Sequence, residues 1–410
     1  MKIKTAAFCF TFVLFSFSAP PIHAQNDSFV LTNANIIDGK TNSIQSGRAI
    51  VVKGGVINAI VSDTSRLPAG IKRIDLKNLY IIPGLVDAHA HVDNLEDAAR
   101  ALSYGTTTIR SASVGSYADV ALQRLVQQGK IAGPEIIPTG VFVQPNLGES
   151  ILADPELAGL YDGVESEQAL RKLVQINIGN GAQVIKTRSA ERAGAPETDP
   201  RKQVYTERQL AIIVDEAAKK NIPVMAHAHG AVLEAVKAGV ASIEHGTYAT
   251  EEALRLMKEN GTYLVPTYST VLDLTQPGGD YDHPVTTIRG QYMLPQMEKM
   301  LKMAMDIGVM IAASTDSGYG PESITRVATE AVNFVKLGMD PFDAIQSATS
   351  TAAELLQISS RTGTIEVGKE ADIVVLFENP LADIRAIQDI IMVISNGIVV
   401  QNRLPFGLDE

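Results

Sequence analysis

Two histidines in this sequence follow directly on a short apolar run. The run 79–86 leads to His89 and His91, which are two residues apart. On a strand, positions i and i+2 point to the same side, so these imidazoles would lie side by side at a strand end. Two imidazoles placed in this way supply half of a typical metal site. Taken alone, the pair could equally be two polar residues at the end of a strand.

The other histidines repeat this arrangement. His227 and His229 close the apolar run that begins at Ile222, and His245 closes the run that begins at Ala241. Parallel α/β proteins build their active sites from the carboxyl ends of several strands. The three positions together therefore predict a metal centre at such an edge.

Two further strand ends carry groups that could act beside a metal. Lys186 follows Val184 and Ile185, and a lysine buried among apolar neighbours tends to lose its proton. A neutral amine can react with carbon dioxide to give a carbamate, which can bridge two ions. Pairing with an acid, or extension to solvent, is the alternative. Asp316 ends another strand, where a turn or capping role is its alternative.

The elements that must position these residues alternate between strands and helices. This pattern predicts an α/β fold, a (β/α)₈ barrel of the TIM type. The eight expected strands begin at 81, 106, 135, 182, 222, 241, 262 and 309, and the last ends at Ala313. The expected helices are 118–128, 165–178, 206–220, 231–238, 251–259, 291–306 and 322–337. Thr206 and Gln209 form a capping-box pattern at the start of one of them.

The two ends of the chain have a different pattern. Short β-branched runs separated by turn residues occupy 29–75 and 363–396. They predict one small β-sandwich formed from both termini, with a structural role. The expected division is 1–24 signal peptide, 25–82 first part of the sandwich, 83–361 metal-binding barrel and 362–410 second part of the sandwich.

Residues 1–24 resemble a secretory signal peptide. Lys2 and Lys4 precede an apolar stretch, 6–17, and 22–24 form an imperfect cleavage site. The stretch is too short to span a bilayer comfortably, so we expect export to the periplasm or secretion without stable membrane insertion. A retained amphipathic anchor is the alternative. The only cysteine, Cys9, lies here, which excludes disulfides, thiolate ligands and a cysteine nucleophile from the mature chain.

The composition limits the partners. The chain has 35 basic and 46 acidic residues, a formal charge of −11 that becomes −13 without Lys2 and Lys4. An acidic protein of this kind is a poor nucleic-acid binder. We expect a small-molecule partner, and a homo-oligomer is compatible with the sequence.

These motifs resemble those of the amidohydrolase superfamily, in its binuclear type with a carboxylated lysine. Within it, the chain is similar to the imidazolonepropionase-related group, which includes prolidase-like dipeptidases, carboxypeptidases and ochratoxin-type amidases. The resemblance covers nearly the whole mature chain. The segments that carry it are 83–91, 184–186, 227–230, 242–246, 314–317 and, for the terminal β-domain, 363–374.

The resemblance implies the role of each residue. It implies two divalent ions, with zinc favoured by the nitrogen-rich, thiol-free donors. His89, His91 and Asp316 would hold the first ion, and His227 and His245 the second. Lys186, as a CO₂-derived carbamate, would bridge both. Asp316 would also act as general base and then acid, with His229 in contact with the substrate.

The substrate is predicted from side chains expected near the strand ends. Arginines bind carboxylates through paired hydrogen bonds, so they suggest an anionic substrate end, although each could instead be solvated or paired with a nearby acid. The candidate substrate-binding residues are Arg188, Arg192, Arg110, Tyr248 and Tyr268. Related chains often carry an aspartate where this one has Ser111, which leaves any role of that acid in doubt.

We therefore expect hydrolysis of an amide or peptide bond in a dipeptide or N-acyl amino acid with a free carboxylate. Alternatives within the superfamily are hydrolysis of a lactam or other cyclic amide, of a carbamate or of an ester, and deamination. An alternative of another class is a non-catalytic periplasmic binding protein.

Overall fold

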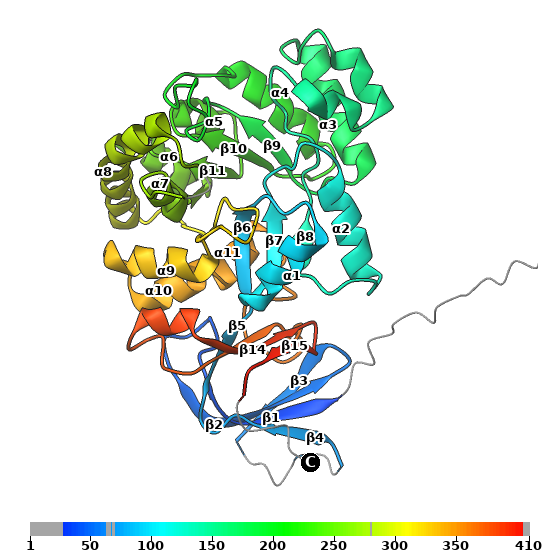
Figure 1. Ribbon diagram of the computed structural model, residues 1–410, viewed down its shortest axis with the longest axis vertical. Helices are drawn as coiled ribbons and strands as arrows, with labels where there is room; N and C mark the ends of the chain where they lie inside the picture. The colour runs from blue at the N-terminus through cyan, green and yellow to red at the C-terminus, as the bar shows by residue number, and fades with distance from the viewer. Residues whose placement is uncertain (1–27, 63–66, 68–69, 279–280, 405–410) are drawn as a thin grey trace, which may run out of the picture.

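The computed structural model describes residues 28–404 except 63–66, 68–69 and 279–280. It consists of a part in which helices surround parallel strands and a β-rich part built from both ends of the chain (Figure 1). The expected signal peptide, with Cys9, lies outside the described residues. Within the described ranges, no helix is both long and apolar enough to cross a membrane.

The β-rich part is a single hydrogen-bonded sheet with the strand order β15-β14-β13-β5-β1-β2-β3, and β4 pairs with β1. We expected a sandwich, but the hydrogen bonding runs through all eight strands because β13 pairs with β5 and so joins the two ends of the chain. Its strands are β1 (Phe29–Ile36), β2 (Gln45–Lys53), β3 (Val56–Val61), β4 (Lys72–Asp75), β5 (Tyr80–Pro83), β13 (Ile373–Leu376), β14 (Ile390–Ser395) and β15 (Ile398–Asn402).

The other strands are parallel and form two sheets. One has the order β6-β7-β8 and the other β12-β11-β10-β9. Both carry buried residues on both faces, as expected of parallel strands covered by helices. The strands are β6 (Leu85–Ala90), β7 (Thr106–Ser111), β8 (Glu135–Ile137), β9 (Ile185–Arg188), β10 (Val224–Ala228), β11 (Ser242–His245) and β12 (Tyr263–Val265).

Backbone contacts link the two parallel sheets. Val143 N–H donates to Lys186 O at 2.9 Å, and Asp316 N–H donates to His89 O at 2.7 Å. The expected strand 309–313 makes a single isolated bridge, between Ile311 and Leu264. The strand expected from Glu135 to Val143 is shorter than predicted, because β8 ends at Ile137.

Helices cover the parallel strands (Figure 1). The capping box at Thr206 and Gln209 is confirmed. Two predicted helix starts are wrong: α8 begins earlier, with Pro284 at its first position, and α9 begins later. The helices are α1 (Leu95–Ser103), α2 (Ala118–Gln127), α3 (Glu167–Asn180), α4 (Glu207–Ala218), α5 (Val232–Lys237), α6 (Glu251–Asn260), α7 (Tyr268–Asp273), α8 (Pro284–Ile307), α9 (Val327–Lys336), α10 (Pro341–Ser347) and α11 (Ser350–Leu355), with 3₁₀ helices η2 (Gly148–Leu152), η3 (Pro155–Leu160) and η4 (Ile384–Gln388).

Gly84 marks the passage from the β-rich part to the parallel strands. It lies between β5 and β6, and a Cβ placed there would lie 2.2 Å from Thr107 Oγ1. Only glycine allows the chain to pass so close to β7. The boundary expected between residues 82 and 83 lies one residue before the end of β5.

Candidate metal and active site

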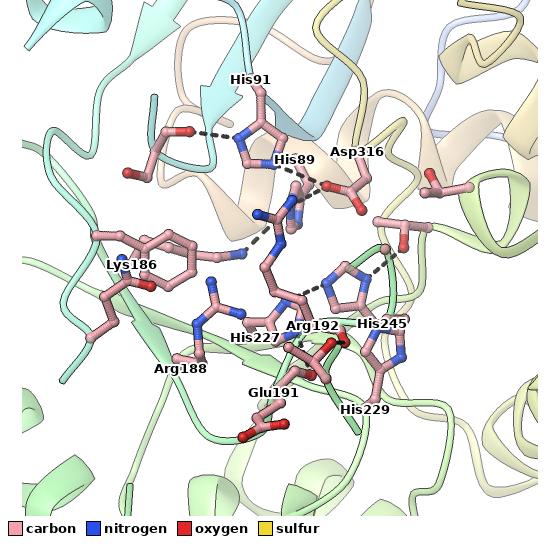
Figure 2. Close-up of a pocket in the computed structure, with 18 of the residues that line it drawn as sticks. His89, His91, Lys186, Arg188, Glu191, Arg192, His227, His229, His245 and Asp316 are labelled. Atoms are coloured by element: carbon pink, nitrogen blue, oxygen red, sulfur yellow. Dashed lines mark hydrogen bonds and ion pairs between the residues drawn. The ribbon is translucent and has the colours of Figure 1, made fainter. Parts of the chain in front are cut away.

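The predicted metal ligands line one cavity of about 1280 Å³ (Figure 2). They come from the carboxyl-terminal parts of β6, β10 and β11, from the second residue of β9 and from the segment after Ala313. The donor atoms of six side chains form two compact groups, each with all atoms within 4.8 Å of one another. The first histidine group is His89, His91 and Asp316, and the second histidine group is His227, His229 and His245.

In the first histidine group, both imidazoles face one carboxylate oxygen. Asp316 Oδ1 lies 3.0 Å from His91 Nε2 and 3.1 Å from His89 Nε2. The outer nitrogens are fixed from behind, His91 Nδ1 by Ser113 O and His89 Nδ1 by a Glu244 oxygen, each at 2.6 Å. A carbonyl and a carboxylate only accept hydrogen bonds, so each outer nitrogen carries the proton. The inner nitrogens of both rings then point to Asp316, and three potential donor atoms around one point suit a cation.

The second histidine group is held in a similar way. His227 Nε2 lies 3.2 Å from Glu191 O, so its Nδ1 faces inward, 2.8 Å from His245 Nε2. His245 Nδ1 lies 2.7 Å from Thr267 Oγ1. Burial holds the pKa of both rings well below the usual value, with further lowering by neighbouring positive groups. Neutral imidazoles are the form that binds a metal.

His229, which we expected to contact the substrate, lies within the second histidine group. Its ring stacks on His245 with centroids 4.4 Å apart. Its Nδ1 lies 2.9 Å from Thr247 Oγ1, and burial lowers its pKa to about 3. A neutral His229 can therefore contact either a substrate or an ion.

Lys186 lies beside the first histidine group. It is 1% exposed, and its Nζ lies 3.4 Å from His89 Nε2. Burial lowers its pKa to about 7. A sizeable share of the side chain is therefore the neutral amine near neutral pH, which is the form that reacts with carbon dioxide.

Arg110 does not line the cavity, which corrects its expected contact with the substrate. It is buried behind His89, where its Nη2 lies 3.0 Å from Glu244 and its Nε donates to Ala88 O. Although burial alone would raise the pKa of Glu244, Arg110 and His89 lower it to about 2. The arginine thus keeps a charged carboxylate behind His89.

Arg188 has the surroundings expected of an anion-binding residue. It lines the cavity, is 9% exposed, and stacks over Phe142 with its guanidinium 4.5 Å from the ring centre. Its Nη1 is buried without a hydrogen-bond partner. Burial, with Arg192 nearby, lowers its pKa to about 10, so it stays charged at neutral pH.

The other rim residues divide into two kinds. Arg192 lines the cavity and is exposed, pointing into the site in Figure 2. Arg201, another arginine of the same loop, instead pairs with Asp199 at 2.8 Å. Tyr248 and Tyr268 are not among the residues that line the cavity, which differs from the expected substrate contacts. The hydroxyl of Tyr268 donates to Glu298 at 3.0 Å.

Several supporting residues escaped the sequence-based prediction. Glu244 could have been suspected, since a buried acid inside an apolar strand requires a partner. Thr267 gave no such signal. It has a left-handed backbone with φ 50°, as do His245 with 73° and Asp316 with 51°. Such conformations are uncommon for these residues and concentrate at functional sites.

Comparison with known proteins identifies the class. The Amidohydrolase family model matches residues 80–400. Ochratoxinase from Aspergillus niger is 30% identical over 355 residues, covering 75% of this chain and 72% of that protein. Imidazolonepropionase from Brucella suis is 24% identical over 402 residues, covering 86% and 93%. A crystal structure of a Xaa-Pro dipeptidase with methionine bound in the active site has a TM-score of 0.81 and 28% identity, covering 91% of this chain and 99% of that one. The chain belongs to the amidohydrolase family.

Family membership confirms the resemblance drawn from the motifs. The protein is a hydrolase that acts on carbon–nitrogen bonds of a small-molecule substrate, which sets aside the non-catalytic binding protein. Members of this family use divalent metals, and both histidine groups could hold one.

Proposed function

We propose that this hydrolase is a binuclear metal-dependent enzyme that cleaves the amide or peptide bond next to a free carboxylate, in a dipeptide or N-acyl amino acid. The observation that carries the proposal is Arg188. A buried, charged guanidinium with an unpartnered Nη1 lines the same cavity as both histidine groups. An unpaired buried donor is costly, and a substrate carboxylate would satisfy it.

The proposed ligands follow the two groups. His89, His91 and Asp316 would hold one ion, and His227 and His245 the other, with zinc favoured by the donors. Lys186 would join them as a carbamate: its neutral amine adds to carbon dioxide, a new N–C bond forms, and one proton leaves. When bound, such ions polarise a substrate carbonyl and activate water.

The chain's own side chains would complete the reaction. Asp316 would accept a proton from the attacking water and deliver it to the leaving nitrogen. Arg188 and Arg192 would hold the free carboxylate and so fix the scissile bond. His229, buried and neutral, would contact the substrate from the second histidine group.

The test compares an N-acyl amino acid with its C-terminal amide. Amidation should lower kcat/KM at least about 10-fold, equal to about 1.4 kcal/mol, because it removes the charge that Arg188 binds. Arg188→Met or Arg192→Met should shrink this preference. Arg201→Met is the matched control, since that arginine is already paired with Asp199. Equal turnover of acid and amide would contradict the proposal and favour a lactam, carbamate or neutral ester as substrate.

We also propose that the two parallel sheets and the segment 310–317 form one (β/α)₈ barrel. The chain would then divide into a first part of the β-rich domain, 25–82, the barrel, 83–361, and a second part of the β-rich domain, 362–410. Backbone hydrogen bonds from Val143 to Lys186 and from Asp316 to His89 support the barrel. Limited proteolysis that released a stable fragment from inside 83–361 would contradict this division.

Export is proposed from the sequence of residues 1–24 alone. We expect the mature chain to begin at or near Gln25 in a periplasmic or culture fraction. Amino-terminal sequencing of the natural protein tests this, and a retained Met1 in the cytoplasmic fraction would contradict it.

A further inference from the structure

Glu330 is a buried carboxylate that the proposed reaction does not use. It lies on α9, fully buried, and accepts three hydrogen bonds from the first two residues of α7. The Tyr268 and Ser269 N–H groups donate at 2.7 and 2.8 Å, and the Ser269 hydroxyl donates at 2.5 Å. A buried carboxylate is costly unless it is hydrogen-bonded in this way.

The residue before these donors explains why they need a distant acceptor. Thr267 is the N-cap of α7, and an N-cap threonine commonly accepts a hydrogen bond from the first helical turn. Thr267 makes no such bond: its backbone is left-handed, with φ 50°, and its Oγ1 lies 2.7 Å from His245 Nδ1. Glu330 accepts the N–H groups of Tyr268 and Ser269 in its place.

The same short helix also reaches the first histidine group. The Thr270 hydroxyl donates to Thr315 O at 2.6 Å, directly before Asp316. Asp316 and His245 both have left-handed backbones. A helix attached at both points supports one candidate ligand in each group.

We propose that Glu330 is a positioning residue: by capping α7 in place of Thr267, it leaves the Thr267 hydroxyl free to orient His245 towards the metal. Glu330 is not among the residues that line the cavity, so it acts through Thr267 and does not touch the substrate. This inference rests on the proposed metal centre.

The test is Glu330→Gln. Glutamine keeps the size of the side chain, but its amide group places an N–H donor opposite one of the N–H or O–H donors of α7, so at least one hydrogen bond is lost. Zinc affinity, measured by competition with a chelator, should fall about 10-fold, the lower end of the usual effect of losing a group behind a metal ligand. The absorption spectrum of the cobalt(II)-loaded protein should change, and KM should change less than about threefold.

Asp372→Asn is the matched control. Asp372 is also a buried carboxylate with a backbone and a hydroxyl donor, but it lies in the β-rich part, so zinc affinity and spectrum should stay as in the wild type.

A double-mutant cycle separates positioning from general weakening of the fold. If Glu330 acts through Thr267, adding Glu330→Gln to Thr267→Val should lower zinc affinity less than about twofold further. Should Glu330→Gln not fold, Ser269→Ala removes one of the three bonds and should give a smaller change in the same direction. Fully additive losses, or unchanged zinc affinity and cobalt spectrum in Glu330→Gln, would overturn the inference. A wild-type protein that binds neither zinc nor cobalt would instead overturn the metal centre itself.

Discussion

The two histidine groups lie in one cavity but are supported from behind in different ways. Behind the first, a backbone carbonyl holds His91, but His89 contacts Glu244 at 2.6 Å. Glu244 pairs with Arg110, so a buried ion pair supports His89. Behind the second, the supports are neutral: the hydroxyls of Thr247 and Thr267 and a backbone carbonyl.

This difference shows two ways of presenting an imidazole to a metal. A carboxylate behind an imidazole orients it and raises its basicity, but a buried carboxylate needs its own counter-charge, which Arg110 supplies. Hydroxyls orient a ring at little electrostatic cost, and burial with neighbouring positive groups lowers the pKa of His227 and His245. We therefore expect the first histidine group to depend more strongly on its support than the second.

The largest expected effect is at Lys186, which would join the two groups. Lys186→Ala should lower kcat by about 10⁴-fold or more and remove most bound metal, because both ions would lose a shared ligand. Short-chain carboxylic acids should restore part of both, since they can take the place of the carbamate. Metal analysis and turnover with and without added acid measure this, and full metal with normal turnover in the variant would remove the carbamate from the proposal.

The next effect concerns Asp316, the only carboxylate in either group. Asp316→Asn keeps the size and one oxygen but removes the proton acceptor, so kcat should fall by about 10²–10⁴-fold while metal content falls modestly. Steady-state kinetics with metal analysis tests this. A rise in KM with unchanged kcat would make Asp316 a residue that positions the substrate.

The smallest effect tests the two kinds of support directly. Glu244→Gln should lower zinc affinity about 100-fold, whereas Thr267→Val, behind the proposed ligand His245, should lower it only about 10-fold. Glu244→Gln also leaves Arg110 buried without a counter-charge, which should destabilise the fold by about 3–5 kcal/mol. Zinc competition and denaturant unfolding measure the two quantities.

The control for this comparison is Arg110→Met combined with Glu244→Gln. It should recover stability without recovering zinc affinity, because the unpaired charge is gone and the carboxylate is still missing. Equal losses of zinc affinity in Glu244→Gln and Thr267→Val would show that charge behind the ligand makes no difference.

Much of the fold could be predicted because its signals are local. Apolar runs, turn residues and a capping box at Thr206 predicted most of the elements that the structure contains. The segment 309–313 was predicted as a strand, yet it makes only one isolated bridge, between Ile311 and Leu264. Helix α7 was missed because it has six residues and its cap comes from Glu330, 61 positions from Ser269.

The sequence by itself determined that the candidate metal ligands meet in one cavity. Parallel strands bring their carboxyl ends to one edge, so His89, Lys186 and His245 had to lie near one another once their strands were recognised. Only the tertiary structure decided what stands behind them. Arg110 and Glu244 are 134 positions apart, and their pairing depends on how distant strands pack, which no local pattern encodes. The same physical reason explains why Arg110, which looked like a substrate contact, instead holds a buried charge in place.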